Sequence, residues 1–140
     1  MKDVFVVSAV RTPVGKQKGY LREWIAPELL AHSLNACVDR AGVDPVLVED
    51  VIAGTVYQVG EQAFTLARMA VLASVLPETV PGISVNRQCG SSLSAIQMAA
   101  SMIASGTMEC VIAAGCELMT KYGMISDMNG TLYNGKPMGH

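Results

Sequence analysis

The sequence lacks the segments that direct a chain into or across a membrane. It contains no apolar run near the roughly 20 residues that span a bilayer. Its N-terminus, MKDVFVVSAVRT, carries a charged Asp3 and an apolar run too short for a signal peptide. The net charge is −2 and no basic residues cluster, so nothing in the sequence favours nucleic acid or an anionic membrane as a partner. We expect a cytoplasmic protein.

Metal-binding patterns are also missing. The four cysteines show no C-x-x-C spacing, and the only two histidines lie far apart. Structural zinc sites are built from such paired ligands, so we expect no metal site. In a reducing cytosol the four thiols are expected to stay reduced.

The length and composition of the chain predict one ordinary globular domain. The chain has 140 residues, of which 51% are hydrophobic and only 16% are charged. This length and composition suffice for a sizeable core and exclude a disordered chain. We find no internal repeat and no linker rich in proline or serine.

Short apolar runs alternate with helical patterns along the chain. The apolar runs predict strands at 4–9, 48–54, 82–85 and 110–114, and the helical spacing predicts helices at 27–41, 63–76 and 93–104. Gly42 and Gly106 are expected to end the first and last of these helices. This order predicts an α/β fold, a mostly parallel sheet with helices on both faces and right-handed crossovers.

Two of these elements carry a stronger expectation about burial. The valine-rich run Val4–Ala9 is typical of a buried strand that leads into a loop at Pro13 and Gly15. The segment 93–104 is apolar nearly all round, which predicts a helix buried on every side.

Cys89 is the strongest candidate for chemistry from its position alone. It follows the predicted strand 82–85 and precedes the helix 93–104, where ligands gather in open parallel sheets. The backbone N–H groups and dipole of a helix start stabilise a thiolate, which suits nucleophilic attack on an acyl carbonyl. The small residues Gly90, Ser91 and Ser92 leave room for a substrate and for an oxyanion. The alternative is a buried structural cysteine.

The remaining candidates are better explained by packing or solvation. Cys37 lies on the apolar face of its helix and Cys110 inside a strand. Cys116 follows Ala114 and Gly115 at the end of that strand, where packing is favoured over a functional role. His32 sits on a polar helix face. The stretch GTLYNGK (130–136) resembles most of a phosphate-binding loop, but Pro137 replaces the hydroxyl residue and no apolar strand precedes it.

Four stretches together resemble the thiolases, the acetyl-CoA C-acyltransferases. The stretches, in chain order, are VSAVRTPVG (7–15), NRQCGSSL (86–93), AGCELMT (114–120) and the pair Met138 and Gly139. They are similar to the family's opening segment, its nucleophile motif, its Gly-Gly-x-Glu-x-Met-Ser segment and the start of Met-Gly-x-Thr-Ala-Glu. The resemblance covers nearly the whole chain.

The resemblance implies that Cys89 is the acyl-carrying nucleophile and that its backbone N–H contributes to an oxyanion site. Arg11, Pro13, Asn86 and Glu117 also fall on family motif positions, and we interpret them as structural. The sequence departs from the family where TLAR (65–68) replaces Asn-Pro-Ala-Arg and where Ala114 replaces a glycine. These departures concern local packing more than chemistry.

The resemblance also predicts how the chain is divided. Residues 1–120 are expected to form an incomplete N-terminal thiolase-like domain, and residues 121–140 the start of the family's substrate-covering loop region. The family's activating histidine, in a Gly-His-Pro setting, and its second cysteine, in a Cys-Gly-Gly-Gly setting, belong to a second half. His140 lies within the Met-Gly-x segment and is not that histidine. We therefore expect little or no turnover from these 140 residues alone.

The implied activity is acyl exchange between coenzyme A thioesters, with acetyl-CoA, 3-oxoacyl-CoA and CoA as substrates. No permanently bound cofactor is implied, and members assemble as dimers or tetramers, so a homo-oligomer is expected. Two alternatives remain open. The chain could be a non-catalytic remnant that serves as a binding or dimerisation module, or a decarboxylating condensing enzyme acylated from a carrier protein.

Overall fold

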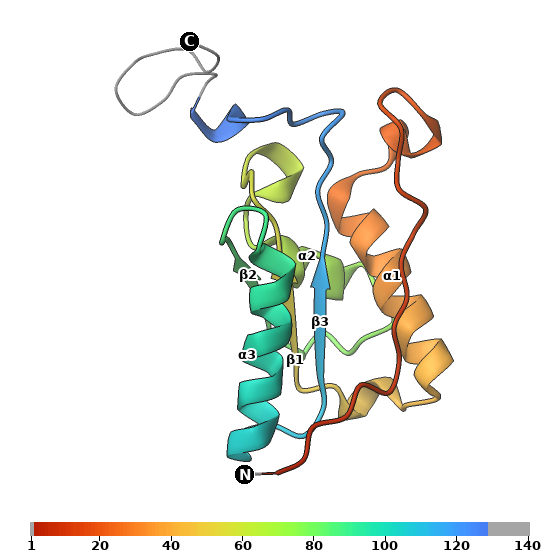
Figure 1. The fold of residues 1–140 in the computed structure, drawn as a ribbon. Coiled ribbons are helices and arrows are strands. Elements are labelled where there is room, and N and C mark those ends of the chain that lie inside the picture. Colours follow the sequence, from red (N-terminus) through yellow and green to blue (C-terminus); the bar gives the residue numbers. More distant parts are fainter. Residues whose placement is uncertain (1, 129–140) are drawn as a thin grey trace.

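The computed structural model describes residues 2–128, and its core is a three-stranded parallel sheet with helices on both faces (Figure 1). The main elements in chain order are α1 (Ala26–Ala41), β1 (Asp50–Gly54), α2 (Leu66–Leu72), β2 (Gly82–Val85), α3 (Ser91–Ser105) and β3 (Val111–Gly115). The strand order is β2-β1-β3, and β1 pairs in parallel with both neighbours. The α/β fold class predicted from the sequence is confirmed.

The central strand β1 separates two apolar layers. Its five residues are all buried, because helices cover both faces of the sheet at this strand. Val51 and Ala53 belong to the larger core, which includes residues of α1 and α2, whereas Ile52 packs with Ala95 and Ala99 of α3. Successive residues of β1 therefore point to opposite faces of the sheet and contact the helices on each face in turn.

Helix α1 follows its sequence pattern closely. Pro27 lies in its first turn, and Gly42 ends it in the left-handed conformation at φ 64°. The Gly42 N–H donates to the carbonyl oxygens of Val38 and Asp39 at 3.1 Å each, which satisfies two of the last helical acceptors. Leu34 and its apolar neighbours face the core, so α1 provides one wall of the domain.

The predicted buried strand Val4–Ala9 is wrong for this structure. The segment belongs to neither a helix nor a strand, and the side chains of Phe5 and Val6 are 78% and 82% exposed. One hydrogen bond lies just before the segment, from the Lys2 N–H to the Ala104 oxygen at 3.0 Å, and one at its end, from the Arg40 guanidinium to the Ala9 oxygen at 3.2 Å. The segment runs beside α1 (Figure 1) without a strand partner, and a strand forms only through such pairing.

Two predicted helices also differ from the structure. The second helix, Leu66–Leu72, is shorter than 63–76 at both ends. At its start Phe64 and Thr65 adopt positive φ values of 54° and 56°, which lie outside the helical region. Helix α3 is not buried on every side, since Leu93 and Ile96 are 60% and 52% exposed. One apolar face of α3 packs on the sheet, and no described element covers its other apolar face.

Beyond β3 the described chain contains turns and a short 3-10 helix, Ser126–Met128. Several predictions fall outside the described residues. They concern the stretch 130–136, which resembles a phosphate-binding loop, the pair Met138 and Gly139, and His140. In the part that the structure does describe, no helix is both long enough and apolar enough to cross a bilayer.

Candidate active site

Cys89 lies on the tight turn that joins β2 to α3, and its side chain is exposed. The Ser91 hydroxyl and backbone N–H both donate to the Gln88 carbonyl oxygen, at 2.6 and 3.0 Å. The Gly90 N–H donates to the Arg87 oxygen at 3.0 Å. Gln88 has φ +48°, an unusual conformation for a residue with a side chain, and the turn's hydrogen bonds hold it there.

Two glycines bring this turn to the carboxyl ends of the strands. Gly54 and Gly115 end β1 and β3 and pair with each other in the sheet register. A Cβ on Gly54 would overlap the Ser91 and Ser92 backbone, and one on Gly115 would overlap the Ser92 side chain. Only glycine lets the first turn of α3 approach the sheet this closely, so these two residues fix where the Cys89 turn lies.

A polar network surrounds the segment that leaves β3. The Glu117 carboxylate accepts from the backbone N–H groups of Val56 at 2.7 Å and Tyr57 at 3.3 Å, and from the Gln62 amide nitrogen at 2.8 Å. Gln62 is fully buried, and its amide also bonds the Tyr57 oxygen at 2.8 Å and the Leu118 N–H. The loop after β1 and the segment after β3 are thereby joined.

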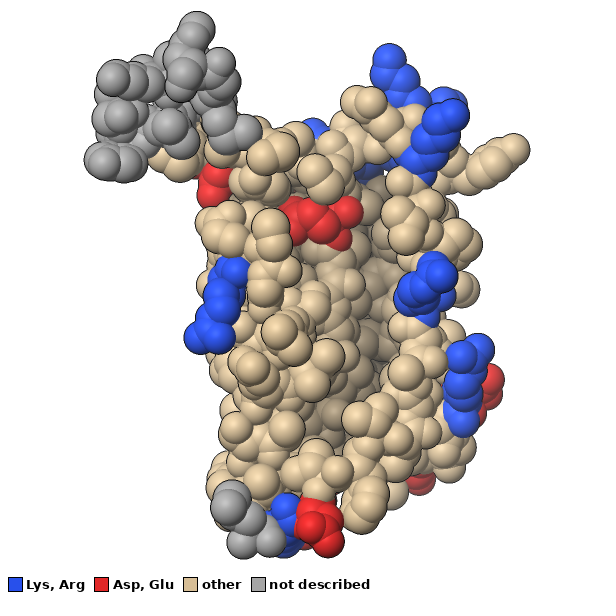
Figure 2. All heavy atoms as spheres, in the orientation of Figure 1, with Lys and Arg blue, Asp and Glu red and all other residues tan. Residues whose placement is uncertain are grey.

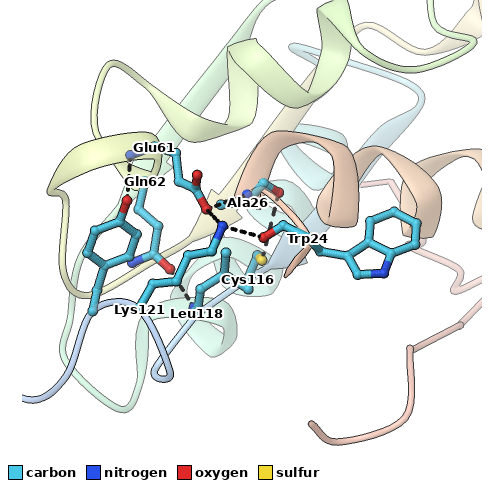
Figure 3. A network of polar contacts seen from close by, with 8 residues as sticks. Trp24, Ala26, Glu61, Gln62, Cys116, Leu118 and Lys121 are labelled. Carbon is cyan, nitrogen blue, oxygen red and sulfur yellow. Dashed lines mark hydrogen bonds and ion pairs between the residues drawn. The ribbon is translucent and has the colours of Figure 1, made fainter. Parts of the chain in front are cut away.

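Lys121 adds a second attachment for the same segment. Its ammonium group contacts the Glu61 carboxylate at 2.9 Å and the Trp24 carbonyl oxygen at 2.8 Å. Figure 3 shows Lys121 directed toward both groups, with Gln62 directed toward Leu118 beside them. On the other side of Glu117, the Cys116 N–H donates to the Gly54 carbonyl oxygen at 3.1 Å, so the chain is anchored both before and after Glu117.

The other cysteines are less suited to nucleophilic chemistry. Burial raises the pKa of the Cys116 thiol to about 11, and the carboxylates of Glu117 and Glu61 add to this rise. Burial also raises the pKa of Cys110, followed by smaller effects of Glu49 and Cys37. A raised pKa leaves little thiolate near neutral pH, and the thiolate is the attacking species. Cys37 is half-buried on α1.

A cleft of about 590 Å³ lies away from Cys89, between residues 11–17 of the N-terminal segment and residues 115–121 at and beyond the end of β3. The face of the molecule in Figure 2 is hollowed along its middle, and mostly uncharged residues line the hollow. Cys89 lines neither this cleft nor a second cavity of about 320 Å³ along α3. Within residues 2–128, no group of three or more His, Cys, Asp or Glu residues could hold a metal ion.

The residues on the predicted motif positions do not meet in one place. Arg11, Pro13 and Glu117 line the cleft of about 590 Å³, whereas Asn86 and Cys89 do not. Glu117 and Asn86 both bond to Val56. Sequence reasoning missed Gln62, because nothing in the local pattern distinguishes a buried amide. It also missed the pair Gly54 and Gly115, although glycines at strand ends ahead of a helix start are a signal of close backbone approach.

Comparison with known proteins finds one family whose sequence pattern matches this chain. The family description "Thiolase, N-terminal domain" matches residues 4–138. A steroid 3-ketoacyl-CoA thiolase of Mycobacterium tuberculosis is 43% identical over 128 residues, which cover 91% of this chain and 31% of that protein. An acetyl-CoA acetyltransferase of Cupriavidus necator is 44% identical over 120 residues, covering 86% of this chain and 30% of that protein.

A solved structure is similar to this chain in three dimensions as well as in sequence. The crystal structure of the Bacillus anthracis acetyl-CoA acetyltransferase superimposes with a TM-score of 0.78 at 40% sequence identity. The match covers 82% of this chain and 29% of that chain. The chain therefore spans about 30% of the length of the relatives that it matches.

Proposed function

Because the chain belongs to the thiolase family, corresponding to the family's N-terminal domain, we propose that it is the nucleophile-bearing portion of an acyltransferase. The enzyme exchanges acyl groups between coenzyme A thioesters, and Cys89 carries the acyl group. The observation that supports this role is that Cys89 is exposed on a constrained turn at the start of α3. The more buried thiols of Cys110 and Cys116 have raised pKa values.

The helix start assists the proposed chemistry in two ways. The peptide dipoles of α3 (Ser91–Ser105) add to a partial positive charge beside Cys89, which favours negative charge there. The backbone N–H of Cys89 donates to the oxyanion that forms when the thiolate adds to a carbonyl. Both effects depend on the turn keeping its shape during the reaction.

In the degradative direction the Cys89 thiolate adds to the 3-keto carbon of a 3-oxoacyl-CoA. The tetrahedral oxyanion then collapses, the bond between carbons 2 and 3 breaks, and the electron pair leaves on carbon 2 as the enolate of acetyl-CoA, which takes up a proton. Free CoA next attacks the acyl-Cys89 thioester through its thiolate and releases the shortened acyl-CoA. The reverse sequence is a Claisen condensation, which needs a base for the acetyl-CoA methyl group.

The groups that donate and accept these protons are proposed to lie in the part of a full-length thiolase that this chain does not span. We propose that residues 1–120 form the nucleophile domain and that 121–140 begin a substrate-covering region. The substrates are acetyl-CoA, 3-oxoacyl-CoA and CoA, without a permanently bound cofactor. The active form is a cytoplasmic homo-oligomer, a dimer or a tetramer.

The test is the intact mass of the protein after incubation with acetyl-CoA, with Cys89→Ala as control and peptide mapping of any adduct. We expect one added acetyl group on Cys89 that the variant lacks. Cys37→Ala is the matched variant that removes a half-buried thiol instead, and it should acetylate normally. An adduct that persists in Cys89→Ala would overturn the assignment.

Turnover is expected to need more than this chain. Nucleophile, base, oxyanion donors and CoA pocket act together with strongly non-additive effects, so an activated thiol alone does not give catalysis. A steady-state assay with acetoacetyl-CoA and CoA should therefore give little or no rate. Ordinary turnover by the 140 residues would contradict this expectation.

A second candidate function is a non-catalytic binding or dimerisation module, and exposed apolar residues favour it. Phe5, Val6 and Val7 are exposed on the N-terminal segment, and Leu93 and Ile96 on α3. Burial of such side chains against a partner lowers the free energy of the complex. Failure of Cys89 to accept acetyl, together with poor solubility that a partner chain restores, would select this function.

A further inference from the structure

We propose that Glu117 is a positioning residue for Cys89, acting through the Val56 backbone and the Asn86 side chain. The proposal rests on the proposed function, since it assigns Glu117 a role only if Cys89 is the nucleophile. It deepens that function, because it names what holds the nucleophile turn in shape. Three hydrogen-bonded links connect Glu117 to the turn.

The first link joins Glu117 to the loop after β1. An ionised carboxylate is an acceptor only, and Glu117 accepts from Val56 N–H, Tyr57 N–H and the Gln62 amide. Bonds to a charged acceptor are stronger than those between neutral groups, and the bond to Val56 is short at 2.7 Å. The half-buried position of Glu117 limits competition from water.

The second link passes through the backbone of one residue, Val56. The N–H of Val56 points to Glu117, while its carbonyl oxygen accepts from the Asn86 side-chain nitrogen at 2.9 Å. Just before it, the Thr55 N–H donates to the Val85 carbonyl oxygen at 3.1 Å. Hydrogen bonds thus hold both the N–H and the carbonyl group of Val56. Glu117 holds Val56, and Val56 in turn orients the Asn86 side chain.

The third link reaches the nucleophile turn. The Asn86 side-chain oxygen accepts from the Gln88 N–H at 2.9 Å. Gln88 has a positive φ, and such a conformation persists only where surrounding contacts impose it. The Gln88 carbonyl oxygen is held in turn by Ser91. Cys89 therefore directly follows the residue whose backbone N–H the relay holds.

The simpler explanation is that Glu117 only stabilises the fold through its contact with buried Gln62. The two explanations predict different patterns of backbone hydrogen exchange. A loss of general stability accelerates exchange throughout the core, because global unfolding then contributes to every protected amide. A loss of the relay accelerates exchange only along the three links.

The experiment is amide hydrogen exchange followed by NMR on Glu117→Gln, which keeps the side chain's size and removes its charge. We expect exchange at Val56 and Gln88 to rise about tenfold, the scale of one lost charge-assisted hydrogen bond. Exchange at Ile52 in β1 should stay unchanged. Glu78→Gln, which neutralises an exposed carboxylate elsewhere, is the matched control and should change neither site.

Two results would overturn the proposal. One is a uniform rise that includes Ile52, which would make Glu117 a general stabiliser. The other is faster exchange at Val56 with Gln88 unchanged, which would break the relay at Asn86. If Glu117→Gln does not fold, Asn86→Ala tests the same path at an exposed residue, with about a tenfold rise expected at Gln88 and none at Val56. No change at Gln88 in that variant would also refute the relay.

Acetyl transfer from acetyl-CoA to Cys89 supplies the functional readout. Glu117→Gln and Asn86→Ala should each slow it, and the double variant should be no slower than the worse single variant, because both break one path. Additive slowing would refute the common path. If the unmodified chain accepts no acetyl group, the proposed function fails for this chain, whereas the exchange pattern still decides whether Glu117 shapes the turn.

Discussion

Gly54 and Gly115 face each other across the β1 and β3 ladder at the point where α3 (Ser91–Ser105) begins. Neither has room for a Cβ, but the obstacles differ. At Gly54 the obstacle is the backbone of Ser91 and Ser92, whereas at Gly115 it is chiefly the Ser92 side chain. The position of the Cys89 turn therefore depends more on Gly54 than on Gly115.

Replacing Gly54 should displace the start of α3. In Gly54→Ala the new methyl group meets helix backbone, which cannot rotate away, so we expect the free energy of unfolding to fall by about 3 kcal/mol. Urea unfolding followed by circular dichroism measures this change. Gly123→Ala is the control, because a Cβ there meets nothing within 4 Å. Equal effects of the two substitutions would contradict the close approach.

Thr55→Val should stabilise the protein. The Thr55 hydroxyl is buried and has no hydrogen-bond partner among the described residues. Valine keeps the shape without the unpaired group, so the free energy of unfolding should rise by about 1 kcal/mol. Ser84→Ala provides the contrast, since the Ser84 hydroxyl accepts from the Ala67 N–H at 3.2 Å and its loss should destabilise. A lower melting temperature for Thr55→Val would refute the prediction.

Gln62→Leu should destabilise strongly. The fully buried Gln62 amide bonds the Tyr57 oxygen, the Glu117 carboxylate and the Leu118 N–H, and leucine would leave all three without this partner. We expect a loss of about 3 kcal/mol in the free energy of unfolding. Gln97→Leu, at an exposed position on α3, should change it by no more than about 0.5 kcal/mol.

The cysteines should differ in their reaction with iodoacetamide. With a pKa of about 11, Cys116 is ionised to only about one part in a thousand at pH 8, since a pKa above the pH leaves the thiol protonated. The pKa of Cys110 is also raised, whereas Cys89 is exposed. Peptide mapping at pH 8 should find Cys89 modified first. Cys116 should become reactive as pH rises toward 11 or when urea unfolds the chain.

Faster modification of Cys116 than of Cys89 at pH 8 would contradict this prediction. The urea sample controls for differences in reagent access, because unfolding exposes all four cysteines equally. Under those conditions the two thiols should react at similar rates.

Elements set by local pattern could be predicted from the sequence. The strand Gly82–Val85 was predicted with its observed bounds, and the helix ending at Gly42 needed only a regular apolar face and a glycine for its left-handed end. The nucleophile turn was likewise placed between a strand and a helix. These features depend on residues close together in the chain.

The errors concern properties that distant residues decide. Val4–Ala9 has a strand's composition, but pairing depends on a neighbour that the segment itself does not encode. The apolar character of α3 indicates what could be buried and not what covers it. The contact between Glu117 and Gln62 joins residues 55 positions apart, so no local pattern could reveal it.

The unpaired edge of β3 has a consequence for how this chain behaves at high concentration. Among the described residues β3 has one strand partner, β1, and its sequence Val-Ile-Ala-Ala-Gly contains neither a charge nor a proline to discourage another strand. Natural proteins suppress aggregation at such edges with lysine, proline or a covering element. Purified alone, the chain should therefore self-associate in a concentration-dependent way, which light scattering over a dilution series measures.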